Sequence, residues 1–114
     1  MPKPHPYLAQ AKKYEKQMVA FLRDLIAIPS ESGQERPVIE RIKKEMKATG
    51  AFDKIWVDKM GNLLAQVGKP GKGKKLIAID AHVDTVGVGN PKEWKHDPYK
   101  GKVADGKVWG RGAG

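Results

Sequence analysis

The sequence predicts an α/β fold in which helices pack on a mixed β-sheet. In the first half, two segments carry apolar residues at three- and four-residue intervals, which is typical of amphipathic helices. In the second half, short runs of β-branched and apolar residues alternate with turns rich in glycine, asparagine and proline, which is typical of strands. This order of elements favours two helices that cover one face of a sheet.

The first helix is expected over residues 8–28. Residues 1–7 contain three prolines and are expected to form an irregular arm before it. Pro29 disfavours helical geometry at the preceding residue and ends the helix. The apolar positions that form its predicted buried stripe are Tyr14, Met18, Phe21, Leu22, Leu25 and Ile28.

The second helix is expected to begin near residues 34–35. Ser32 and Glu35 have the spacing of a capping box, while Pro37 is tolerated only within the first helical turn. Gly50 is the predicted C-cap. The apolar positions of this helix are Val38, Ile39, Ile42 and Met46.

Two β-hairpins are expected in the second half of the chain. Residues 54–58 and 63–67 flank a turn that contains glycine and asparagine. Residues 102–104 and 107–109 flank an Asp-Gly pair, which is a strong signal for a two-residue turn.

Residues 75–81 form the most apolar run and are therefore the predicted central strand. His82 and Asp84 follow this run, and residues two apart in a strand point to the same face. A carboxylate beside an imidazole fixes the tautomer of a metal-ligating histidine, and open sheets bind ligands at strand ends. The pair therefore indicates a metal site. A surface histidine beside a turn aspartate has the same spacing, so both interpretations stay open at this point.

Length and composition limit the class of protein. At 114 residues, the chain is one domain or part of one. Because cysteine is absent, a metal must be held by imidazole and carboxylate groups. No apolar stretch approaches the roughly 20 residues of a membrane span, and the N-terminus lacks an apolar signal core. We therefore expect a cytoplasmic protein without a membrane partner.

The net charge of +9 arises from 22 lysine and arginine residues against 13 acidic residues. The lysines are scattered along the chain, arginine is scarce, and the lysines of the two predicted helices lie on faces that water would cover. Proteins that bind nucleic acids usually combine a basic stripe with arginines or aromatic side chains. The pattern favours solvated lysine faces, so no nucleic-acid partner is expected.

Three further features have two interpretations each. The glycine-rich segment 110–114 could cradle a phosphate, but without a Lys-Ser/Thr pair or a following helix it is better interpreted as the approach to a site. His96 could ligate a metal, but its surroundings favour a loop packed by Trp94 and Tyr99. Arg111 could contact an anion or brace a turn, and the sequence leaves both open.

Seven short motifs occur in the same order and at similar intervals as in a known family of enzymes. The motifs are Pro29-Ser30, Ser32-Gly33-Gln34-Glu35, Gly61-Asn62, Ala81-His82-Val83-Asp84-Thr85-Val86, Trp94 with Asp97-Pro98, Asp105-Gly106 and Gly110-Arg111-Gly112-Ala113-Gly114. From about residue 11 onward the sequence resembles the acetylornithine deacetylase, succinyl-diaminopimelate desuccinylase and carboxypeptidase family of di-zinc amidohydrolases. Within this family it looks closest to a branch of selenium-metabolism-linked hydrolases.

The resemblance implies a fold and a set of roles. Residues 8–114 would be the N-terminal part of a zinc-peptidase-like, three-layer α/β/α catalytic domain, whose remainder and dimerisation domain lie outside this sequence. His82 matches a ligand of the first zinc ion. Asp84 matches the carboxylate that orients this histidine, and we count it with the catalytic residues. The full-length protein would hold two zinc ions, with cobalt or manganese as alternative metals.

The resemblance also implies an activity. The full-length protein would hydrolyse an amide bond in an N-acyl amino acid or a short peptide, whereas residues 1–114 alone, with one clear ligand, would be inactive. The competing hypothesis is a non-catalytic basic module that binds an anionic partner. An unpaired edge of the strand at residues 76–81 would also favour pairing with another chain, so a homo-oligomer is expected.

Overall fold

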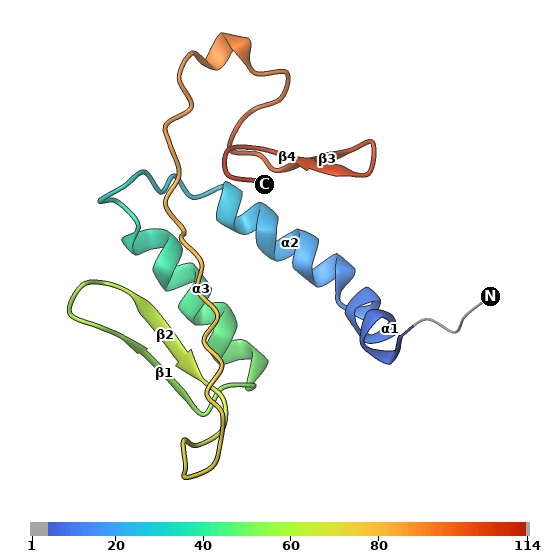
Figure 1. Ribbon diagram of the computed structural model, residues 1–114. Coiled ribbons are helices and arrows are strands. Elements are labelled where there is room, and N and C mark those ends of the chain that lie inside the picture. The colour runs from blue at the N-terminus through green and yellow to red at the C-terminus, as the bar shows by residue number, and fades with distance from the viewer. Residues whose placement is uncertain (1–4, 114) are drawn as a thin grey trace. The chain divides into compact units, whose positions relative to one another are not determined.

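The computed structural model describes residues 5–113 (Figure 1). These residues form two compact units. Residues 29–85 form the central unit. Residues 5–28 and 86–113 form the terminal unit.

The terminal unit begins with two consecutive helices, α1 (Pro6–Lys13) and α2 (Glu15–Ile26). The prediction of one continuous helix over residues 8–28 is therefore wrong. The interruption lies at Tyr14, whose N–H donates to the carbonyl of Ala11 at 3.0 Å and thereby closes a tighter turn. Helix α1 also begins earlier than expected, within the segment predicted to be an irregular arm. Residues 1–4 of that arm lie outside the described residues.

Only the last part of the predicted stripe on these helices is covered. Tyr14 and Met18 are 48% and 61% exposed, whereas Ile26, which lies outside the predicted stripe, is 4% exposed. The core of this unit therefore lies at the C-terminal end of α2.

A loop and a hairpin complete the terminal unit. The loop contains the short 3-10 helix η1 (Pro91–Glu93), and the hairpin pairs β3 (Lys102–Ala104) with β4 (Lys107–Trp109). Asp105 and Gly106 form its turn with φ values of 54° and 69°. Positive φ at both positions matches the right-handed twist of the strands, so the second predicted hairpin is confirmed.

The glycine after β4 lies directly against α2. A Cβ atom on Gly110 would lie 2.5 Å from Cγ2 of Ile26 and 3.1 Å from the carbonyl oxygen of Pro98. The next N–H, from Arg111, donates to the same carbonyl at 2.7 Å. This close approach requires glycine at position 110.

The central unit contains helix α3 (Arg36–Thr49). Its side chain Val38 is 2% exposed, and the proline at position 37 falls in the first turn as expected. Gly50 follows with φ 64° and donates its N–H to the carbonyl of Lys47, which confirms the predicted C-cap.

The predicted capping box before α3 is not formed. Glu35 is the N-cap residue, and its carboxylate accepts a hydrogen bond from the N–H of Gly33 at 2.9 Å. The hydroxyl of Ser32 is directed elsewhere, to a side chain more than fifty residues away. A tertiary contact therefore replaces the local cap that the sequence predicted.

The first predicted hairpin is confirmed as β1 (Lys54–Val57) paired with β2 (Leu63–Gln66). Both strands contact α3, so the helix covers one side of this hairpin (Figure 1). The carboxylate of Asp58 closes the turn by accepting hydrogen bonds from the N–H groups of Met60 and Asn62, both at 2.9 Å.

Residues 75–81 do not form the predicted central strand. They have no regular secondary structure, and Leu76, Ile77 and Ile79 are 85%, 84% and 95% exposed. A strand needs a neighbouring strand for its backbone groups, and none of the described residues pairs with this segment. In place of one mixed sheet, residues 5–113 contain two separate two-stranded antiparallel sheets. The mixture of helices and strands remains consistent with an α/β class.

None of the helices within residues 5–113 is both long and apolar enough to cross a lipid bilayer.

The contact between Gly110 and Ile26 gives a direct test of packing in the terminal unit. Gly110→Ala should reduce the free energy of unfolding by about 1–3 kcal/mol, because the added methyl group overlaps Ile26. In an Ile26→Ala background the same change should have a much smaller effect. Gly71→Ala is the control, since a Cβ there meets only Lys74 at an ordinary 3.5 Å. Equal effects of Gly110→Ala in both backgrounds, measured by urea unfolding, would contradict this packing.

Candidate metal-ligand site

The candidate site is built where the loop before α3 runs beside residues 83–85. Ser30 is 3% exposed, and its hydroxyl donates to the carbonyl of Val83 at 3.1 Å. The N–H of Thr85 donates to the carbonyl of Ser30 at 2.9 Å, and Glu31 forms a parallel β-bridge with Thr85. Main-chain and side-chain bonds therefore fix the segment that carries the predicted site residues.

His82 and Asp84 are in contact, as the sequence predicted. Nδ1 of His82 lies 3.1 Å from the carboxylate oxygen Oδ1 and 3.1 Å from the carbonyl oxygen of Asp84. Both partners are acceptors, so Nδ1 carries a proton, and in the neutral ring Nε2 carries the lone pair. The contact forms without strand pairing, because the ring folds back onto the residue two positions later.

The two side chains differ in exposure. The imidazole of His82 is 87% exposed, whereas the carboxylate of Asp84 is 37% exposed. The ring therefore presents its remaining nitrogen to the surroundings while the carboxylate lies partly covered behind it. This is the arrangement expected of a metal-ligating histidine with its orienting carboxylate.

Ser32 is a component of the site that the sequence analysis missed. Its hydroxyl donates to Oδ2 of Asp84 at 2.5 Å, so each carboxylate oxygen has its own donor. The hydrogen bond from Ser32, followed by that from His82, lowers the pKa of Asp84 below its ordinary value of 3.8. The carboxylate is therefore held in its ionised form.

The donor chemistry fits one ligand of a zinc ion. A neutral imidazole with its Nδ1–H on a carboxylate offers Nε2 to the metal. A catalytic zinc ion normally has three protein ligands, and no group of three histidine, cysteine, aspartate or glutamate residues is gathered within the described part of the chain. His82 therefore supplies one candidate ligand, and Asp84 is the carboxylate that orients it.

The other candidates identified in the sequence belong to the terminal unit. The ring of His96 packs edge-on against Trp109, with centroids 5.4 Å apart. The guanidinium of Arg111 lies 4.7 Å from the ring centre of Trp94, whose indole N–H donates to the carbonyl of Val88 at 2.8 Å. These contacts favour packing for His96 and a bracing role for Arg111.

Comparison with known proteins adds a second kind of observation. The chain is 51% identical over 105 residues to the uncharacterized protein YgeY of Escherichia coli (strain K12). It is 37% identical over 97 residues to a succinyl-diaminopimelate desuccinylase of Cereibacter sphaeroides (strain ATCC 17029 / ATH 2.4.9), and 33% identical over 97 residues to that of Beijerinckia indica. The matches support a relationship to the desuccinylase family.

The desuccinylase matches cover 83% and 80% of this chain, and the match to YgeY covers 92%. The chain spans about a quarter of the length of these relatives. No protein-family model matches it. The relationship to desuccinylases agrees with the resemblance inferred from the motifs, and both include the segment that holds His82 and Asp84.

The hydrogen bonds to Asp84 predict its titration in the metal-free protein. Because the folded-state pKa is lowered, the ionised carboxylate stabilises the fold above the unfolded-state pKa, and this contribution is lost as the pH falls through the folded-state pKa. Ser32→Ala and His82→Ala should each move the pKa of Asp84 up toward 3.8. The measurement is a carboxyl ¹³C NMR titration. An unchanged pKa of Asp84 in Ser32→Ala would contradict the assignment of Ser32 as the main donor.

Proposed function

We propose that these residues form the N-terminal part of the catalytic domain of a zinc-dependent amidohydrolase related to the desuccinylases. The full-length protein would hydrolyse an amide bond in an N-acyl amino acid or a short peptide. The observation that carries the proposal is the contact between His82 and Asp84, which leaves Nε2 of an exposed imidazole ready for a metal ion. The names of the relatives support the reaction class.

The proposed roles follow from the hydrogen bonds. His82 is neutral and offers Nε2 to one of two zinc ions, while Asp84 accepts the Nδ1 proton and stays ionised. When bound, zinc supplies Lewis acidity that polarises the substrate carbonyl and lowers the pKa of a bound water to about 7. Asp84 keeps the imidazole in one tautomer and orientation. The remaining ligands and the general base would come from residues outside this sequence.

The exposed apolar segment also has a place in this proposal. Leu76, Ile77 and Ile79 would become a buried strand by pairing with strands from the rest of the catalytic domain, which would complete the three-layer architecture. The same unpaired segment would drive self-association when that partner is absent.

The proposal is tested in the full-length protein by metal content and hydrolysis of N-succinyl and N-acetyl amino acids. His82→Ala should lose one equivalent of zinc together with activity. Asp84→Asn should keep the ligand but weaken zinc binding by about 10–100-fold, because a neutral amide replaces the charged acceptor that orients the ring. His96→Ala is the control, since this ring packs on Trp109 and should not affect metal content.

Zinc content that is unchanged in His82→Ala would refute the role of this histidine. Loss of zinc in His96→Ala to the same extent would show that any histidine substitution disturbs the protein.

A second candidate function is supported by a basic recess in the terminal unit. The recess has a volume of about 440 Å³ and is lined by Arg23, Lys100, Lys102 and Val103. Nε of Arg23 donates to the carbonyl of Gly101 at 2.8 Å, so this guanidinium is fixed in place. One carboxylate, that of Asp97, lies 3.6 Å from Nζ of Lys100. Three cations around one hollow favour an anionic group such as a phosphate or a carboxylate.

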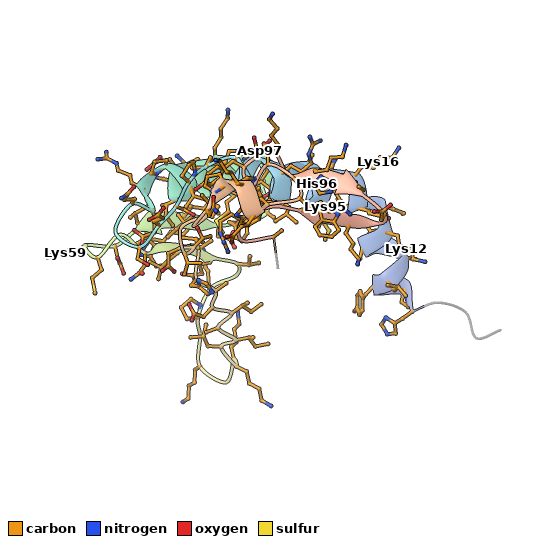
Figure 2. All side chains as sticks on the ribbon, turned by 90° about the horizontal axis from the view of Figure 1, so that it is seen from above. Lys12, Lys16, Lys59, Lys95, His96 and Asp97 are labelled. Carbon is orange, nitrogen blue, oxygen red and sulfur yellow. The ribbon has the colours of Figure 1, made fainter. Side chains whose placement is uncertain are left out.

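This candidate is tested by calorimetric titration of the full-length protein with pyrophosphate. The pair Lys100→Gln/Lys102→Gln should weaken binding several-fold, because it removes charge from the recess and leaves the Arg23 hydrogen bond intact. The pair Lys12→Gln/Lys16→Gln removes the same charge from α1 and α2 (Figure 2) and should have little effect. If both pairs weaken binding equally, pyrophosphate is attracted by the net charge of the protein and not by the recess.

A further inference from the structure

The two serines of the loop before α3 make different contacts with residues 83–85. Ser30 is buried and bonds to the backbone of Val83, so its hydroxyl stabilises the path of the chain. Ser32 is exposed, and its hydroxyl donates to the carboxylate of Asp84. The first contact is a structural anchor, whereas the second acts on a side chain that itself contacts His82.

The orientation of Asp84 needs such a contact. The terminal torsion of an aspartate is soft, and the carboxylate of Asp84 is 37% exposed. Carboxylate oxygens are also good zinc ligands in their own right. With Oδ1 on His82 and Oδ2 on Ser32, turning the carboxylate toward a metal ion bound to the imidazole would break these hydrogen bonds.

Ser32 is itself held by the conformation of its loop. The N–H of Gln34 donates to the carbonyl of Glu31 at 2.8 Å, which closes a turn around Ser32. Gly33 has φ 86°, a conformation that residues with a side chain rarely adopt, and its N–H donates to the carboxylate of Glu35. The hydroxyl therefore projects from a turn whose shape is fixed by the residues on both sides.

We propose that Ser32 is a positioning residue of the metal site: its hydroxyl holds the Asp84 carboxylate in the orientation that accepts the Nδ1 proton of His82. The sequence motif Ser-Gly-Gln-Glu thus precedes α3 and also supplies, through Ser32, the hydrogen bond that orients the carboxylate behind His82. This inference rests on the proposed function of His82 as a zinc ligand.

The test measures zinc affinity of the full-length protein, the absorption spectrum of its cobalt(II) form, and the melting temperature of the metal-free form. Ser32→Ala should raise the zinc dissociation constant by about 10-fold or more and change the cobalt spectrum, because the freed carboxylate alters the ligand environment. Ser32→Thr retains a hydroxyl and should restore both properties. The melting temperature of the metal-free protein should change little.

Ser30→Ala is the matched control from the same loop. It removes a buried hydrogen bond to Val83 and should lower the melting temperature. The backbone bond from Thr85 to Ser30 still holds the segment in place, so the folded protein should keep its zinc affinity and cobalt spectrum. Weaker zinc binding in both serine variants, in proportion to their loss of stability, would overturn the proposal, since Ser32 would then act only through the loop. Wild-type affinity and spectrum in Ser32→Ala would also overturn it.

His82→Ala separates this inference from the proposed function. If His82→Ala retains all its zinc, the proposed function fails and the inference fails with it. If His82→Ala loses zinc while Ser32→Ala behaves as wild type, the function stands and only the positioning role of Ser32 is refuted.

Discussion

The candidate site depends on the hydrogen bonds that join the loop at residues 30–32 to residues 83–85. Residues 74–84 have no regular secondary structure, so no strand or helix holds His82 and Asp84 in place. The backbone bond from Thr85 to Ser30 and the β-bridge between Glu31 and Thr85 supply that constraint, and the buried Ser30 hydroxyl adds stability. Because ordering a flexible segment opposes folding, a segment without regular structure needs such specific contacts to present side chains in one geometry.

The same contacts connect chain segments that are about fifty residues apart. One end of the connection is the turn that leads into α3, and the other is the segment that carries the imidazole. The carboxylate of Asp84 stands between them and receives a hydrogen bond from each side. A serine, a carboxylate and an imidazole thus form a continuous chain whose last member exposes Nε2. For a metal-ligating histidine, this arrangement supplies both the correct tautomer and a fixed ring orientation.

Features that depend on a few neighbouring residues could be predicted from the sequence. Gly50 ends α3 in the left-handed conformation, and the turn at Asp105 and Gly106 has positive φ at both positions. Each of these features follows from the local steric preferences of glycine or aspartate. The contact between His82 and Asp84 belongs to the same group, because its partners are two positions apart.

Features that depend on distant partners could not be predicted. The apolar run at residues 75–81 has the composition of a buried strand, but a strand forms only where a neighbour pairs with it. Ser32 has the spacing of a helix cap, but a carboxylate 52 residues away accepts its hydrogen bond. The break between α1 and α2 at Tyr14 carries no proline or glycine that would have revealed it. The family resemblance includes the motifs that contain Ser32, His82 and Asp84, but it does not show which of their atoms are in contact.

The most direct test of the account is ¹⁵N NMR of the His82 imidazole in the full-length protein, with and without zinc. The account predicts that Nδ1 stays protonated and hydrogen-bonded in both states, while the Nε2 resonance moves to the position of a metal-bound nitrogen when zinc is added. Ring nitrogens whose resonances do not respond to zinc, or a zinc ion bound through Nδ1, would contradict it.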